Sequence, residues 1–215
     1  MPRTLPALVT ACGPTVRDDG GVRVFAAIVP SEPARAHLEA FLVPRRAGEP
    51  VLRWTPPHLW HVTLAFMAEV PGDGLDDVVH AITREATASP PLHLRLVGAG
   101  FFPDTHEARV AWLGLGADAP GALDDLTGLA LRTRRACSAA GAPTAGGPYT
   151  PHLTLARSRH PVDATPWLAT LGDYVGPAWC AHEVTVFVSR EQRGGRPHYV
   201  AEHSCPLGGG NSVAP

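Results

Sequence analysis

The stretches His61-Val-Thr-Leu64 and His152-Leu-Thr-Leu155 repeat one pattern, His-x-Thr-Leu, in two distant parts of a 215-residue chain. A proline-containing segment precedes each of them, Thr55-Pro-Pro57 in one case and Tyr149-Thr-Pro151 in the other. In a β-strand, side chains two positions apart point to the same face of the sheet. Each stretch therefore presents one imidazole and one hydroxyl on a common side. A single short motif carries a high risk of chance occurrence, so the prediction depends on the repeat.

The residues around the motifs predict alternating strands and helices. Strands are expected at residues 22–29, 61–66, 92–97, 109–115, 152–156, 183–188 and 199–203, and helices at 31–42, 75–87, 121–140 and near Trp167. Ser31 is the expected N-cap of the first helix. The strands near Leu92 and Arg109 are joined by too few residues for a helical crossover, so part of the sheet must be antiparallel. An α+β or mixed-sheet fold of two similar halves follows. If the halves pack as pseudo-symmetric lobes, the two motifs face each other across a groove.

One folded domain is expected over residues 22–203, because 215 residues that are 45% hydrophobic can bury a single core. Residues 1–21 contain Pro and Gly without periodicity and are expected to form a flexible extension, and residues 204–215 a disordered tail. No apolar run reaches the roughly 20 residues of a membrane-spanning helix. Four widely spaced cysteines indicate neither a zinc site nor a disulfide framework. We expect a cytoplasmic protein, and nothing indicates an oligomer rather than a monomer.

The charge distribution limits the possible partners. A formal net charge of −2 excludes the generally basic surface that binds duplex nucleic acid, so any contact with nucleic acid is expected to be local. All 18 cationic residues are arginine, which we interpret as a coding bias. One arginine cluster falls in a predicted helix and is expected to be a solvated face; it consists of Arg132, Arg134 and Arg135. A second cluster lies in a Gly-rich loop that could reach a substrate; it consists of Arg190, Arg193 and Arg196.

The paired motifs suit in-line cleavage of a phosphodiester. With His61 and His152 opposed across a phosphate, one imidazole takes a proton from an attacking water and the other, protonated, gives one to the leaving oxygen. The hydroxyls of Thr63 and Thr154 can hydrogen-bond the non-bridging oxygens, where negative charge is held in the transition state. This chemistry requires no metal.

Two neighbouring features bear on this site. His58 and His61 have metal-pair spacing, but no carboxylate or cysteine stands nearby at ligand spacing, so no metal is expected. Arg157 follows the second motif, and regular alternation turns it to the side of Leu155, away from the groove. If the strand ends at Ala156, the guanidinium can instead turn toward a phosphate. Both orientations stay open at this point.

These residues resemble the 2H phosphoesterase superfamily, specifically its bacterial and archaeal RNA 2′,3′-cyclic phosphodiesterase branch, once described as 2′-5′ RNA ligases. The resemblance covers residues 22–203 and is carried by residues 22–28, 52–64, 102–103, 110–114, 149–157 and 186–189 with Tyr199. It implies a bilobal α+β fold, in which two pseudo-symmetric halves with largely antiparallel sheets line a central cleft and the helices lie outside. It also implies no cofactor and opening of a terminal 2′,3′-cyclic phosphate to a 2′-phosphomonoester.

In that resemblance His61 is the general acid toward the leaving 3′ oxygen and His152 is the base for water. Thr63, Thr154 and Arg157 are then the residues that bind the substrate phosphate. One position departs from the family pattern, because the family often has a basic residue directly after the first motif and this chain has Ala65.

Other functions remain compatible with the motifs, which handle the phosphate while other surfaces choose what is attached to it. One alternative is a 2H phosphoesterase that acts on another small cyclic nucleotide or joins 2′-5′ RNA ends. A second alternative, from a different class, is a non-catalytic protein that binds RNA ends. The expected partners are therefore RNA 3′ ends or a cyclic nucleotide.

Overall fold

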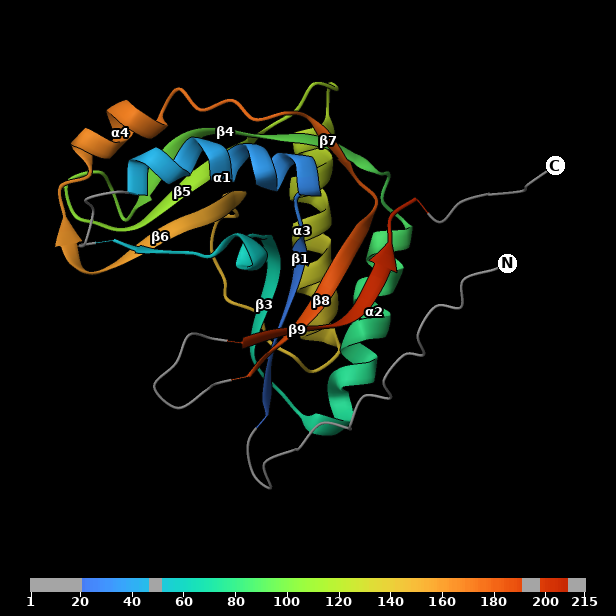
Figure 1. The fold of residues 1–215 in the computed structure, drawn as a ribbon. Coiled ribbons are helices and arrows are strands. Elements are labelled where there is room, and N and C mark those ends of the chain that lie inside the picture. The colour runs from blue at the N-terminus through green and yellow to red at the C-terminus, as the bar shows by residue number, and fades with distance from the viewer. Residues whose placement is uncertain (1–20, 47–51, 191–197, 209–215) are drawn as a thin grey trace, which may run out of the picture.

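The computed structural model describes residues 21–46, 52–190 and 198–208, which form one curled sheet with helices packed on it (Figure 1). The strands are β1 (Val22–Ile28), β2 (Arg53–Trp54), β3 (Val62–Val70), β4 (Leu92–Phe102), β5 (Ala108–Gly116), β6 (His152–Val162), β7 (Trp179–Ala181), β8 (Glu183–Arg190) and β9 (His198–Pro206). The helices are α1 (Glu32–Arg46), α2 (Leu75–Thr87), α3 (Ala122–Ala139) and α4 (Thr165–Leu171), with 3-10 turns η1 (Pro57–Leu59) and η2 (Gly72–Gly74). None of these helices has the length and apolar character needed to cross a membrane.

The order of strands divides the fold into two similar halves. The sheet runs β7-β4-β5-β6-β3-β1-β8-β9, with β2 added beside β6, and its ladders are antiparallel. One half is β1-α1-β3-α2-β4 and the other is β5-α3-β6-α4-β8. The last strand of each half pairs with the first strand of the other, β4 with β5 and β8 with β1. The predicted α+β fold of two pseudo-symmetric halves is confirmed.

The two motif strands meet at the centre of the sheet. β3 and β6 are neighbours, and their ladder is a single pair between Val62 and Leu153, the middle residues of the two His-x-Thr stretches. Both side chains are fully buried in the core. Alternation along a strand sends the flanking histidine and threonine to the opposite face. The core that anchors the centre of each motif therefore also aims its polar residues away from that core.

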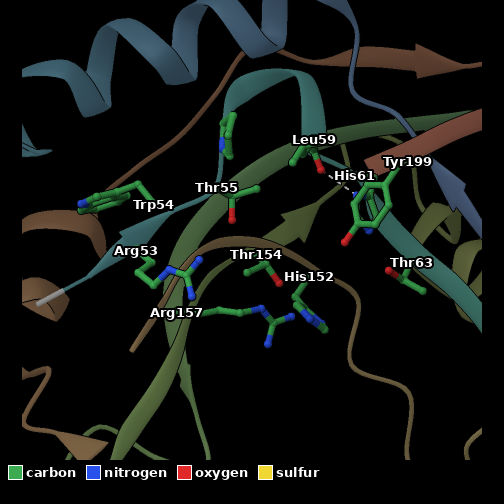
Figure 2. A pocket seen from close by; sticks show the side chains of 11 residues that line it. Arg53, Trp54, Thr55, Leu59, His61, Thr63, His152, Thr154, Arg157 and Tyr199 are labelled. Carbon is green, nitrogen blue, oxygen red and sulfur yellow. Dashed lines mark hydrogen bonds between the residues drawn. The ribbon is translucent and has the colours of Figure 1, made fainter. Parts of the chain in front are cut away.

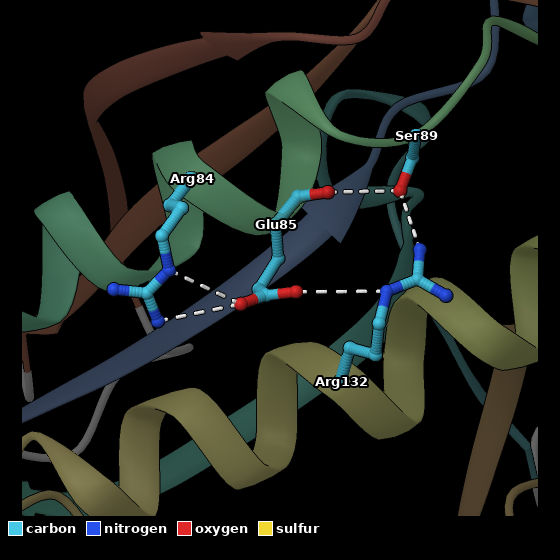
Figure 3. Close-up of polar contacts among 4 residues, drawn as sticks. All are labelled: Arg84, Glu85, Ser89 and Arg132. Atoms are coloured by element: carbon cyan, nitrogen blue, oxygen red, sulfur yellow. Dashed lines mark hydrogen bonds and ion pairs between the residues drawn. The ribbon is translucent and has the colours of Figure 1, made fainter.

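Helices α2 and α3 pack side by side on one face of the sheet (Figure 1). A polar network joins them at one end, around the half-buried carboxylate of Glu85 (Figure 3). Arg132 lies 3.5 Å from this carboxylate and donates a 2.6 Å hydrogen bond to the hydroxyl of Ser89. That hydroxyl donates in turn to the main-chain carbonyl of Glu85. Arg132 is exposed, as expected for a solvated face, and it also connects the two helices.

The boundaries differ from the sequence expectation at several places. Strands β3, β4 and β6 run farther than expected, to Val70, Phe102 and Val162, and α1 continues to Arg46. The short strands β2 and β7 were not expected, because two or three residues carry too little periodic signal. β9 continues to Pro206, with Cys205 buried in it, and Leu207 packs on the core. Residues 204–208 are therefore part of the fold and not of a disordered tail. The expected extension lies outside the described residues except for Gly21, and 209–215 lie outside them as well.

Candidate active site

A cavity of about 280 Å³ lies along the strands that carry the two motifs (Figure 2). Its lining consists of Arg53, Trp54, Thr55, Pro56, Leu59, His61, Thr63, His152, Thr154, Arg157 and Tyr199. All five residues selected from the sequence, the two histidines, the two threonines and Arg157, are among them. Among the described residues, this lining contains no carboxylate, so the side chains there that titrate or carry charge are basic, apart from the tyrosine.

The central pair of the sheet sets which residues of the two motifs are neighbours. Antiparallel register through Val62 and Leu153 places His61 opposite Thr154, and Thr63 opposite His152. Residues directly opposite on antiparallel strands have Cβ atoms roughly 5 Å apart. Each imidazole therefore has the hydroxyl of the other motif as its cross-strand neighbour. A phosphate above this pair of strands can contact groups from both halves of the molecule.

Both imidazoles are held by the same backbone hydrogen bond. Nδ1 of His61 donates to the carbonyl oxygen of Leu59 at 2.7 Å, and Nδ1 of His152 donates to that of Thr150 at 2.8 Å. A carbonyl oxygen only accepts, so the Nδ1 atoms carry the protons and Nε2 is the nitrogen left for a ligand. The prolines before each motif shape these segments, since Pro57 starts η1 and Pro151 holds the residue before it in an extended conformation.

Burial and positive charge lower the pKa of both histidines. For His61 the main cause is burial, followed by repulsion from His152 and Arg157, and the hydrogen bond to Leu59 acts in the opposite direction. For His152 the pKa is also lowered mainly by burial and then by Arg157. Both imidazoles are therefore neutral in the empty site at neutral pH, and each can act as a base. An anion in the cavity would favour the protonated form that an acid needs.

Arg157 faces the cavity because a β-bulge breaks the alternation of β6. On β5, Ala111 pairs with Ala156 and Trp112 pairs with Thr154, so Leu155 is an extra residue in β6. Such an insertion shifts the side-chain parity by one. Thr154 and Arg157 thus share a face although they are three positions apart. β6 continues past Ala156 to Val162, so the bulge, and not the end of the strand, turns the guanidinium toward the motifs (Figure 2).

The same bulge recurs at Leu64 in β3, between the pairs Ala26 with Ala65 and Ala27 with Thr63. The position equivalent to Arg157 is therefore Phe66, which is 42% exposed. Ala65 is fully buried and does not line the cavity. The missing basic residue after the first motif consequently leaves no gap in the lining of the cavity.

Comparison with known proteins identifies the family of this chain. The chain matches the family model of the 2′-5′ RNA ligase superfamily over residues 29–193. The chain belongs to this family. A relative from Thermus thermophilus named RNA 2′,3′-cyclic phosphodiesterase is 34% identical over 150 residues, which are 67% of this chain and 73% of the relative. A relative of the same name from Geobacillus stearothermophilus is 29% identical over 62% of this chain and 41% of its own length.

Solved structures show the same fold. A crystal structure of a Thermus thermophilus protein superposes with a TM-score of 0.70 at 27% identity, covering 88% of this chain and 100% of that one. The family indicated by the sequence is confirmed, and the shared name of the relatives matches the enzyme class that the resemblance implied.

In this member of the 2′-5′ RNA ligase superfamily, aromatic rings enclose each histidine. The ring of His61 lies 4.8 Å from that of Phe25 and 5.7 Å, edge on, from that of Tyr199. The ring of His152 lies 5.1 Å, edge on, from that of Phe102 and 5.9 Å from that of Trp112. These rings supply the burial that lowers the pKa of each imidazole.

Two residues that do not line the cavity hydrogen-bond the strand of the first motif from the other half of the molecule. The hydroxyl of Tyr149 donates to the carbonyl of Thr63 at 3.2 Å, and Nε of Arg134 donates to the carbonyl of Leu64 at 3.0 Å. The guanidinium of Arg134 also lies 4.9 Å over the ring of Tyr149. Arg134 therefore contacts the strand of the first motif and is not part of a solvated face, whereas Arg135 is exposed as expected.

Sequence reasoning assigned no role to the other six cavity residues of this family member, which are Arg53, Trp54, Thr55, Pro56, Leu59 and Tyr199. Arg53 and Trp54 belong to the two-residue strand β2, and the only available signal was their place in the lead-in to the first motif. Of the loop arginines, Arg190 ends β8 and lies 3.6 Å from Glu202. Arg193 and Arg196 lie outside the described residues.

The side chains around the cavity do not assemble a metal site. Within the described ranges, no group of three or more His, Cys, Asp or Glu side chains is arranged to hold a metal ion. His58 is exposed on η1 and does not line the cavity, so the pair of His58 and His61 does not converge on it.

Proposed function

We propose that this protein hydrolyses the 2′,3′-cyclic phosphate at the end of an RNA to a 2′-phosphomonoester, by acid-base catalysis with two histidines and without a metal. The observation that carries the proposal is the matched placement of His61 and His152. Each donates through Nδ1 to a backbone carbonyl two residues earlier, and both line one cavity. The names of the relatives support the choice of substrate.

The reaction assigns one role to each cavity residue. Nε2 of His152 takes a proton from a water molecule, whose oxygen attacks the phosphorus atom. The bond from phosphorus to the 3′ oxygen breaks, and Nε2 of protonated His61 gives its proton to that oxygen. The phosphate then remains on the 2′ oxygen. This division of roles between the histidines follows the family resemblance, since the pKa of both side chains is lowered.

The remaining polar groups suit the phosphate itself. The hydroxyls of Thr63 and Thr154 donate to the two non-bridging oxygens, whose negative charge grows in the transition state. The guanidinium of Arg157 lies on the same face of β6 as Thr154 and stabilises the same negative charge. Donors that are fixed on strands before the substrate arrives need no reorganisation during the reaction.

The test is turnover in EDTA of a short RNA that ends in a 2′,3′-cyclic phosphate, with the position of the product phosphate identified. His61→Ala and His152→Ala should each lose activity by at least about 10²-fold, because each removes an acid-base group. His80→Ala is the matched control, since His80 is exposed on α2, away from the cavity. Loss of activity in EDTA that a divalent metal restores would contradict the proposal.

Other outcomes would favour the alternatives. RNA binding without turnover by the wild type would indicate a protein that binds RNA ends. Turnover of a small cyclic nucleotide but not of RNA would move the substrate to that class. We further propose a monomeric cytoplasmic protein. Gel filtration tests the oligomeric state. Free thiols suit a reducing compartment, and the structure shows them at Cys137, Cys180 and Cys205.

A further inference from the structure

We propose that Arg53 forms a second anion site at the mouth of this cavity, for the phosphodiester that precedes the terminal nucleotide. The inference rests on the function proposed above and deepens it. It predicts that the protein prefers the end of an oligonucleotide to a cyclic mononucleotide, although both carry the same reactive phosphate. The observations that carry it are the register of β2, the charges of the cavity and the exposure of Arg53.

Arg53 and Arg157 are direct partners in the antiparallel ladder of β2 and β6. Both side chains line the cavity (Figure 2). Among the residues that the structure describes, neither guanidinium has an ion-pair or hydrogen-bond partner, and the lining contains no carboxylate. Like charges directly opposite each other on paired strands destabilise a sheet unless something compensates them. Two unneutralised guanidiniums side by side therefore suit a ligand with more than one negative charge.

The two arginines differ in their relation to the histidines. Arg157 lowers the pKa of both His61 and His152 by its charge, and Arg53 is not among the main causes of either shift. Figure 2 shows the same order, with Arg157 beside Thr154 and His152 and with Arg53 farther along, toward Trp54. Arg157 is thus the guanidinium at the reacting phosphate. Arg53 is displaced from it by one strand.

The size of the cavity indicates that Arg53 contacts a different phosphate from the one that Arg157 contacts. A volume of about 280 Å³ is at the lower limit of the roughly 300–1,000 Å³ of pockets that enclose a small molecule. We expect the terminal nucleotide of an RNA to occupy this volume and the preceding nucleotides to lie outside it. Arg53 and Arg157 are both exposed, unlike the two histidines and Thr154, and Arg53 is the one that lies farther from the histidines (Figure 2). An exposed guanidinium at the exit meets the next phosphate of the departing chain, which a cyclic mononucleotide lacks.

The test compares three substrates that share the same terminal cyclic phosphate. They are a cyclic mononucleotide, a dinucleotide with a normal phosphodiester, and the same dinucleotide with an uncharged methylphosphonate linkage. The variants are Arg53→Gln and Arg53→Lys, with Arg135→Gln as the matched control because Arg135 is exposed on α3. We expect the wild type to favour the charged dinucleotide.

Arg53→Gln should lower kcat/KM on the charged dinucleotide about tenfold, in the range of a charge-assisted hydrogen bond in a partly exposed site. The values for the mononucleotide and for the uncharged dinucleotide should change by less than about twofold, and Arg53→Lys should restore part of the loss. An equal loss on all three substrates would place Arg53 at the reacting phosphate and overturn the proposal. Unchanged kinetics on all three would also overturn it.

A binding measurement separates this proposal from the function on which it rests. The affinity of the wild type and of Arg53→Gln is measured for the two dinucleotides ending in a 2′-phosphate, which need no turnover. If the wild type hydrolyses none of the cyclic substrates, the proposed function fails. Tighter binding of the charged dinucleotide that depends on Arg53 would still support the second anion site, and equal binding of both dinucleotides would overturn it.

Discussion

The hydroxyl of Tyr149 donates a hydrogen bond to the backbone carbonyl of Thr63 at 3.2 Å, so the lead-in of the second motif holds the centre of the first. Burial raises the pKa of this hydroxyl, which keeps it protonated and able to donate. The contact crosses between the two halves of the molecule. It fixes the strand from which the hydroxyl of Thr63 enters the cavity.

Removing this contact should affect catalysis more than folding. Tyr149→Phe keeps the ring on which Arg134 stacks and removes only the hydroxyl. We expect kcat to fall about fivefold, which corresponds to roughly 1 kcal/mol for one hydrogen bond. The pH profile should stay unchanged, because neither imidazole loses a contact. A changed profile with an unchanged kcat would contradict a positioning role for Tyr149.

The threonine hydroxyls can be tested without changing side-chain shape. Thr63→Val and Thr154→Val remove the proposed donors to the phosphate oxygens, and each should lower kcat by about 10²-fold, as for one lost oxyanion donor. Both positions are half-buried at the cavity, and neither hydroxyl has a recorded hydrogen bond within the described residues, so thermal stability should change little. Steady-state kinetics and thermal unfolding check the two expectations. A kcat within about threefold of wild type in both variants would exclude these hydroxyls from the reaction.

The pH dependence follows from the lowered pKa of both histidines. The proposed reaction needs one neutral and one protonated imidazole, and the ordinary pKa of each is 6.5. In the free enzyme the required mixture is therefore most populated below pH 6.5, and kcat/KM should peak there. The profile of kcat should lie at higher pH, because the bound phosphate anion favours imidazolium.

Arg157→Gln tests the cause of this shift. It removes a positive charge that lowers the pKa of His61 and His152, so both values should rise and the kcat/KM profile should move toward alkaline pH. The maximum of kcat/KM should also fall, since the phosphate loses a partner. A profile that keeps its position while its height falls would mean that Arg157 binds substrate without tuning the histidines.

The same pKa change predicts a loss of stability in acid. Because the pKa of buried His61 lies below 6.5 in the folded state, the unfolded chain binds the proton first as the pH decreases. The contribution to stability is complete above pH 6.5 and is lost as the pH falls below it. Denaturant unfolding of wild type and His61→Gln on both sides of pH 6.5 should show a smaller acid-induced decrease for the variant. An equal decrease in both proteins would contradict this linkage.

The sequence was informative where structure is local and repeated. The helix at 75–87 coincides with α2, because Leu75, Val78, Ile82 and Ala86 repeat at helical spacing. The motif strands and their shared groove were predictable from the period of two in His-x-Thr. The family resemblance then assigned the chemistry, which the spacing alone left open among several substrates.

The remaining features depend on contacts between distant residues. Arg53 enters the cavity only because a two-residue strand pairs with β6, about a hundred residues later in the chain. The direction of Arg157 depends on a bulge at Leu155, which is visible in the register against β5 and not in the alternation of residues 152–157. The hydrogen bond from Tyr149 to Thr63 likewise joins a loop and a strand that no periodicity in the sequence connects.

The exchange of strands between the halves has a consequence during synthesis of the protein. β1 leaves the ribosome before the other strands, yet one of its two neighbours, β8, begins only at Glu183. A nascent chain thus displays both motifs before Phe187 exists to stack on Phe25, whose ring supports His61. The aromatic packing around His61 is completed late, so a ribosome-bound chain that lacks β8 should have no activity even though both proposed catalytic histidines have already been translated.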